Sequence, residues 1–125
     1  MLRPRVLVVT DDAVAAEAIR ATLMAEGYDV DTTSRSAEAL GQFAQYPYDL
    51  LIASLRLPDG DGPGLYWGLR DRWPSAYPRV LFLLQAGDPI PPSGRGLAGP
   101  AAPVLPVPFT PEALREIVRR ALGAL

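Results

Sequence analysis

Residues 48–62 read Tyr48-Asp49-Leu50-Leu51-Ile52-Ala53-Ser54-Leu55-Arg56-Leu57-Pro58-Asp59-Gly60-Asp61-Gly62. Within this stretch, residues 50–55 form a nearly continuous apolar run that is too short for an ordinary helix and is bounded by turn residues. Such a run is typical of a strand buried on both faces in a parallel sheet. The residues after the strand then lie at the carboxyl edge, where open α/β folds place their sites. The stretch therefore predicts an α/β fold with Ser54 at the functional edge.

Further apolar runs predict the other strands of the sheet, at residues 6–9, 28–33, 80–84 and 104–107. Helical periodicity and capping residues predict helices at 13–26, 34–45 and 63–73, and a last helix that begins after Thr110. Strands alternating with helices in this way predict a flavodoxin-like, doubly wound, five-stranded parallel sheet in the strand order 2-1-3-4-5. In that order the first and third strands are neighbours, so we expect Asp11 and Ser54 to lie close together.

The segment 85–103 departs from this pattern. It contains five prolines and four glycines, although a crossover of this length normally holds a helix. Proline removes a backbone donor, and glycine costs about 1 kcal/mol at a helix-interior position. The composition therefore predicts that the fourth helix is missing or irregular, and that Ile90 and Leu97 are the apolar residues available to cover the sheet.

The composition excludes several classes of chemistry. The chain of 125 residues has no cysteine or histidine, and its 12 basic residues are all arginine. Zinc sites of the Cys/His type, Ser-His-Asp or Cys-His catalysis, and Schiff-base lysines are therefore excluded. The net charge of −2 comes with no basic face, which argues against nucleic-acid binding by this domain. No segment has the pattern of a membrane span or a signal peptide, so we expect one cytoplasmic domain over residues 1–125.

The order and spacing of these motifs resemble the receiver domain of bacterial response regulators over essentially the whole chain. The matching landmarks are Asp11 after the first strand, Pro58 and the Asp61-Gly62 turn after the third, and Pro108-Phe109 before the last helix. In that family, acids after the first strand bind Mg²⁺, and an aspartate at the end of the third strand accepts a phosphoryl group. A hydroxyl on the fourth strand and a lysine before the Pro-Phe pair complete the family's pocket.

Position by position, the resemblance implies a degenerate phosphoacceptor pocket, whose members are Thr10, Asp11, Asp12, Ser54, Leu84 and Val107. Thr10 replaces the first acid and Ser54 replaces the phosphoacceptor aspartate. Leu84 stands where the family has its hydroxyl, and Val107 stands where it has its lysine. Serine is a poor nucleophile without an adjacent base, so we interpret Ser54 as a small residue that fits a crowded strand end. Asp11 and Asp12 are weak candidates for metal ligands, so Mg²⁺ binding is expected to be weak or absent.

The resemblance, together with these departures, implies an atypical, phosphorylation-independent receiver (a pseudo-receiver). We expect it to act in a two-component-type pathway by binding another signalling protein, with no enzymatic activity and no contact with nucleic acid or membrane. Candidate partner contacts are Trp67, Ile90, Leu97 and Val104, the last near the family's switching aromatic position. Asp59 and Asp61 are interpreted as turn-forming residues.

Two alternatives stay open for the function. In the first, the domain is still phosphorylated in a phosphorelay, at a non-standard site such as Asp11, Asp12 or Ser54. In the second, it is a small-ligand-binding flavodoxin-like module that uses the crevice at the carboxyl edge of the sheet.

Overall fold

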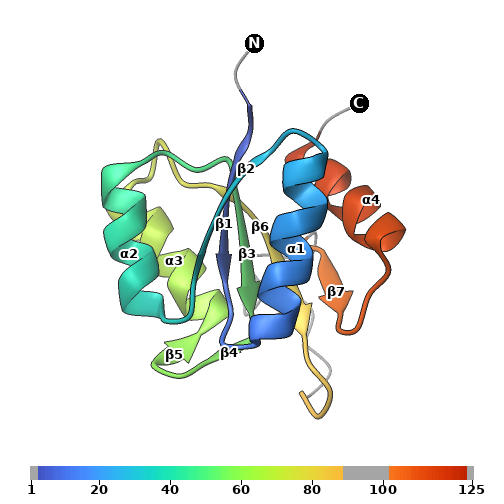
Figure 1. Ribbon diagram of the computed structural model, residues 1–125. Coiled ribbons are helices and arrows are strands. Elements are labelled where there is room, and N and C mark those ends of the chain that lie inside the picture. The colour runs from blue at the N-terminus through green and yellow to red at the C-terminus, as the bar shows by residue number, and fades with distance from the viewer. Residues whose placement is uncertain (1–2, 89–101, 124–125) are drawn as a thin grey trace.

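The structure is a computed structural model that describes residues 3–88 and 102–123. Its main sheet has five parallel strands in the order β2-β1-β3-β6-β7. These strands are β1 (Arg5–Val9), β2 (Asp29–Thr33), β3 (Leu50–Ser54), β6 (Arg79–Leu84) and β7 (Val104–Pro106). Helices α1 (Ala13–Ala25) and α4 (Pro111–Leu122) cover one face, and α2 (Ser36–Gln45) and α3 (Gly62–Arg72) cover the other (Figure 1). The arrangement is flavodoxin-like.

The predicted numbering of the strands, 2-1-3-4-5, needs a correction to 2-1-3-6-7, because the chain has two further strands that the sequence does not predict. The five predicted strands correspond to β1, β2, β3, β6 and β7, and they lie side by side in the predicted spatial order. Strands β4 (Arg56–Leu57) and β5 (Gly60–Asp61) follow β3 and pair with each other in a separate antiparallel sheet. Strands of two residues carry no hydrophobic alternation, so the sequence pattern shows only a turn there. The prediction of a missing or irregular fourth helix concerns residues 85–103, of which residues 89–101 lie outside the described residues. The described ranges contain four helices.

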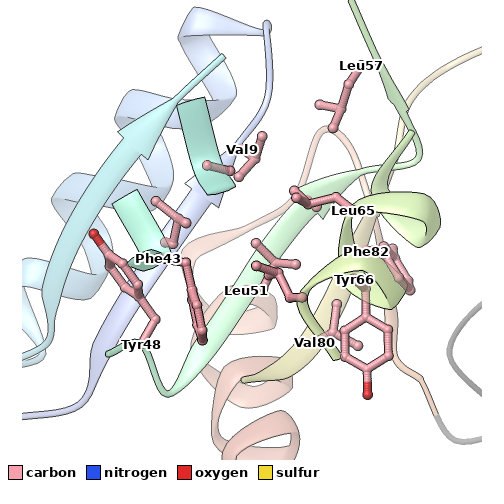
Figure 2. Packing of buried hydrophobic residues seen from close by; sticks show 13 residues of the cluster. Val9, Phe43, Tyr48, Leu51, Leu57, Leu65, Tyr66, Val80 and Phe82 are labelled. Atoms are coloured by element: carbon pink, nitrogen blue, oxygen red, sulfur yellow. The ribbon is translucent and has the colours of Figure 1, made fainter. Parts of the chain in front are cut away.

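The core is divided between the two faces of the sheet by the period of two along each strand. In β1, Leu7 and Val9 belong to the cluster under α2 and α3, whereas Val6 and Val8 belong to the cluster under α1 and α4. Figure 2 shows the first cluster, where side chains of α2 and α3 meet Leu51 of β3. This division explains why the central strands read as continuous apolar runs, since both of their faces are covered.

The two edges of the sheet, β2 and β7, are protected in different ways. On β2, the Asp31 Oδ2 atom accepts a hydrogen bond of 2.7 Å from the Tyr48 hydroxyl and lies 3.9 Å from Arg5 Nη1. Burial of Tyr48 and its hydrogen bond to this carboxylate raise the pKa of the phenol above its ordinary value. Strand β7 has only three residues and contains Pro106, which has no N–H to donate, so the prediction of an edge strand there is confirmed.

Two glycines of α3 provide a test of how tightly the end of β3 is packed. A Cβ on Gly62 would clash with the Ser54 carbonyl oxygen and lie 3.1 Å from the Phe82 ring, whereas a Cβ on Gly68 would meet no atom within 4 Å. We predict that Gly62→Ala destabilises the protein by about 1–3 kcal/mol through overpacking. Gly68→Ala, the matched control, should stabilise it by about 0.5–1 kcal/mol. Urea unfolding of both variants gives the comparison, and equal effects would contradict the packing described here.

Candidate functional site

The carboxyl ends of β1 and β3 meet at a buried pair of hydroxyl groups. Ser54 Oγ donates a hydrogen bond of 2.7 Å to Thr10 Oγ1, and the two residues are 1% and 3% exposed. Thr10 Oγ1 also accepts from the Asp12 backbone N–H at 3.2 Å. The parallel pairing Val9↔Ala53 places the two strand ends side by side, as the sequence predicts, and the side chain that accepts the Ser54 hydrogen bond is that of Thr10.

Asp12 has a structural role as the N-cap of α1. Its Oδ1 atom accepts from the Ala15 backbone N–H at 3.0 Å, at the start of α1. Its Oδ2 atom accepts from Gln85 Nε2 at 3.3 Å. Both oxygens of this carboxylate are therefore engaged within the protein.

Asp11, by contrast, is exposed, and its carboxylate has no hydrogen-bond or ion-pair partner within the described part of the chain. It lines an open hollow of about 430 Å³ between the first turns of α1 and α2, beside the end of β2. The hollow is polar: Thr32, Thr33 and Ser34 lie on its β2 side, and Glu17 and Glu38 lie on its helix side. Glu17 Oε2 lies 3.1 Å from Arg20 Nη2, and Glu38 Oε1 accepts a hydrogen bond from the Ser34 N–H at 3.3 Å.

The remaining pocket positions, Leu84 and Val107, are aliphatic and half-buried. They are joined through the backbone, where the Val107 N–H donates to the Leu84 carbonyl oxygen at 2.9 Å. Val107 packs against the cluster under α1 and α4. These two side chains supply no hydrogen-bond donor or positive charge to the edge of the sheet.

The turn acids cap helices. Asp61 Oδ1 accepts from the Gly64 N–H at the start of α3. Asp59 accepts from the Ser36 and Ala37 N–H groups at 2.8 and 3.0 Å, so it caps α2, whose own N-cap residue makes no side-chain bond. The N–H groups of Ser36 and Ala37, in that order, lower the pKa of Asp59. Because the pKa of Asp59 is lower in the folded protein than in the unfolded chain, the ionised carboxylate stabilises the folded state above about pH 4. This stabilisation is lost as the pH falls through the folded-state pKa.

The predicted partner contacts are described only in part, because Ile90 and Leu97 lie outside the described residues. Trp67 and Val104 are half-buried and pack against the cluster under α2 and α3. The Arg70 guanidinium lies 4.9 Å from the centroid of the Trp67 ring and 4.5 Å from that of Tyr77. Trp67 therefore belongs to an aromatic and cationic group on α3 and the segment after it.

Sequence reasoning missed three residues that lie around the site: Arg56, Gln85 and Asp88. Arg56 Nε lies 3.2 Å from Asp88 Oδ1, and Asp88 Oδ2 accepts from the Gln85 backbone N–H at 2.8 Å. No motif marks these positions, and their separation in the chain hides the contact. The contact between Arg56 and the turn from Gln85 to Asp88 can be predicted only once the order of the strands is known.

The donor set for a divalent cation is small. In residues 3–88 and 102–123, no group of three or more acidic, histidine or cysteine side chains is close enough to hold a metal ion. Asp12 is committed to the α1 cap and Gln85, which leaves the carboxylate of Asp11. Hard-cation sites gather six or more oxygens, several of them from carboxylates, so these residues fit such an ion poorly.

The buried hydroxyl pair provides a double-mutant test. Thr10→Val leaves the Ser54 hydroxyl and the Asp12 N–H without an acceptor and should cost about 1–3 kcal/mol, whereas Ser54→Ala should cost about 1 kcal/mol. The double variant should be about 1 kcal/mol more stable than the sum of the two costs predicts. Thr32→Val, at an exposed position of β2, is the control and should change stability by less than about 0.5 kcal/mol. Additive costs in urea unfolding would show that the hydroxyls do not interact.

No helix in the described ranges is long and apolar enough to cross a membrane. Among proteins of known identity, the chain is similar to transcriptional regulatory protein TrcR of Mycobacterium tuberculosis, with 31% identity over 121 residues, 97% of this chain and 45% of TrcR. It is also similar to cell cycle transcriptional regulator CtrA of Caulobacter vibrioides, with 29% identity over 123 residues, 95% of this chain and 52% of CtrA. The chain thus spans about half the length of these curated relatives.

A solved structure of a candidate response regulator from Chloroflexus aurantiacus superposes with a TM-score of 0.84 at 30% identity, covering 98% of this chain and 99% of that one. The model of the response regulator receiver domain family matches residues 6–119. This match includes every strand and helix except a few residues at the two ends. The chain therefore belongs to the response regulator receiver domain family, the signalling modules of two-component systems.

Proposed function

We propose that this chain is one receiver-type signalling domain that works by contact with another signalling protein, without phosphoryl transfer at Ser54. The observation that carries the proposal is the environment of Ser54, a residue that is 1% exposed and whose hydroxyl donates to Thr10 Oγ1. A nucleophilic serine needs an adjacent base, and the acceptor here is a second hydroxyl. The chain also has no histidine or lysine to act as that base.

The surroundings of Ser54 support the same proposal. Phosphoryl transfer is catalysed mainly by positioning and by positive charge near the transferring group. At the positions where the family has a hydroxyl and a lysine, this chain has Leu84 and Val107, which provide neither. A phosphoryl group at Ser54 would therefore lack charge compensation from these positions, and the domain is proposed to have no enzymatic turnover.

Weak Mg²⁺ binding is part of the proposal. Asp11 offers one free carboxylate and Asp12 is engaged on both oxygens, so a cation gains few charged ligands here. The family's reaction depends on such an ion to offset charge, and a weak site supports signalling that does not use it.

The partner is proposed to be another signalling protein that this domain binds in the cytoplasm. The domain is proposed not to contact nucleic acid. The relatives TrcR and CtrA are named as transcriptional regulators, and this chain matches about half of each. The net charge of −2 and the scattering of the arginines along the sequence argue against a nucleic-acid partner. We therefore assign any regulatory output to a contact between proteins.

One alternative keeps phosphorylation, at Asp11 in place of Ser54. The observation that favours it is the exposed Asp11 carboxylate at the rim of the polar hollow. Incubation of the protein with acetyl phosphate and Mg²⁺, followed by intact-mass measurement, separates the two functions. We expect no phosphoryl adduct, while a receiver with an intact aspartate pocket becomes modified in the same reaction. An adduct lost in Asp11→Asn would establish the alternative, and one lost in Ser54→Ala would overturn the proposal directly.

Calorimetric titration with Mg²⁺ should give a dissociation constant no tighter than about 1 mM, as in the weakest hard-cation sites. Asp11→Asn should leave stability unchanged or raise it, because the variant relieves repulsion between neighbouring carboxylates. Asp12→Ala should cost about 1 kcal/mol, because it removes the α1 cap. Micromolar affinity that disappears in Asp11→Asn would show that the site binds the ion well.

A further inference from the structure

At the carboxyl edge of the sheet, side-chain contacts join three segments: the loop after β1, strand β4 and the turn after β6. The turn formed by residues 85–88, which follows β6, is the centre of the contacts and is called the 85–88 turn. Gln85 Nε2 donates to Asp12 Oδ2 at 3.3 Å in the loop after β1, and Asp88 Oδ1 lies 3.2 Å from Arg56 Nε after β3. Two bonds close the turn itself, from the Gln85 N–H to Asp88 Oδ2 at 2.8 Å and from the Asp88 N–H to the Gln85 carbonyl oxygen at 3.1 Å.

Burial indicates that Asp88 is the critical member of this group. Its side chain is 5% exposed, whereas the Arg56 side chain is 70% exposed. A buried carboxylate requires compensating partners, and within residues 3–88 and 102–123 Asp88 has two: the Arg56 guanidinium and the Gln85 N–H. The attraction between Arg56 and Asp88 is screened on the Arg56 side, so the backbone bond to Gln85 is the stronger of the two contacts.

We propose that the contacts Asp12–Gln85 and Asp88–Arg56 form a tie that fixes the 85–88 turn against the loop after β1 and against strand β4. The tie uses no phosphoryl group or metal ion, so the turn keeps one position in the unmodified protein. Strand β6 leads directly into this turn, and Asp12 at the other end of the tie caps α1. The tie thereby connects the start of α1 to the segment that leaves β6.

The meaning of the tie for signalling rests on the proposed function. A receiver that works without phosphoryl transfer needs a surface with one fixed conformation in its unmodified state. The tie holds the 85–88 turn, at the carboxyl edge of the sheet, in such a conformation. The physical claim, that these four side chains fix the turn, is independent of any partner or phosphoryl donor.

Amide hydrogen exchange, followed residue by residue by NMR, tests the tie. Asp88→Ala removes the acceptor of the Gln85 N–H, and exchange at Gln85 should become about tenfold faster, the change expected for one lost hydrogen bond to a charged group. Arg56→Gln should accelerate it by roughly two- to fivefold, in keeping with an exposed ion pair. Arg72→Gln is the matched control: Arg72 is exposed, has no ion pair within the described residues, and should leave Gln85 unchanged. Asp88→Ala is the positive control, and unchanged exchange at Gln85 in Arg56→Gln would overturn the tie.

A double-mutant cycle on stability gives a second, independent measurement with variants that keep side-chain size. If Arg56 acts through Asp88, the double variant Arg56→Gln/Asp88→Asn should be no less stable than Asp88→Asn alone. Costs that simply add would overturn the coupling. Neither measurement uses a phosphoryl donor, so failure of the tie leaves the proposed function standing. Conversely, a change of Gln85 exchange on adding acetyl phosphate and Mg²⁺ would count against the proposed function while the tie remains.

Discussion

Strand β3 is covered on both faces and flanked on both sides, by β1 and by β6, so none of its five residues is exposed. The helices on both faces of the sheet pack against this buried strand. Leu51 and Ala53 face the cluster under α2 and α3, and Leu50 and Ile52 face the cluster under α1 and α4. The strand must end where the sheet ends, and its last residue, Ser54, is held there with its hydroxyl turned to Thr10. The side chains at this edge are thus limited to those that fit beside a fully packed strand.

The residue at that strand end decides how the edge is built. A carboxylate buried at this depth would require a cation or several donors, whereas a serine is satisfied by one neighbouring hydroxyl. Thr10 meets that need and accepts the Asp12 N–H as well. The two polar side chains therefore form a closed, uncharged unit in the core, and Asp12 is left to stabilise α1. In this chain, Thr10 and Ser54 are therefore bonded to each other, and Asp12 caps a helix.

The sequence was sufficient for features that depend on local patterns. The buried strands follow from continuous apolar runs, and the caps at Asp12 and Thr110 follow from residue type and position. Features that depend on distant contacts were not accessible. The β4–β5 pair is too short to leave a pattern in the sequence. Asp59 caps α2 by accepting a hydrogen bond from Ala37, which is 22 residues away in the chain. Arg56 in β4 forms an ion pair with Asp88 in the turn after β6. Such pairs become visible only after the topology brings their elements to the same edge.

The edge strands also bear on how the molecule can associate. An exposed edge presents unpaired N–H and C=O groups that invite another strand, and charged or proline residues oppose that addition. Strand β2 carries Asp29, which lies 3.6 Å from Arg3, and Asp31, which is held by Arg5 and Tyr48; a strand docking there would have to accommodate both carboxylates. Strand β7 offers three residues, one of them Pro106. Fibrillar growth by strand addition is therefore opposed at both sides of the sheet, and association is directed to the helices and loops that cover its faces.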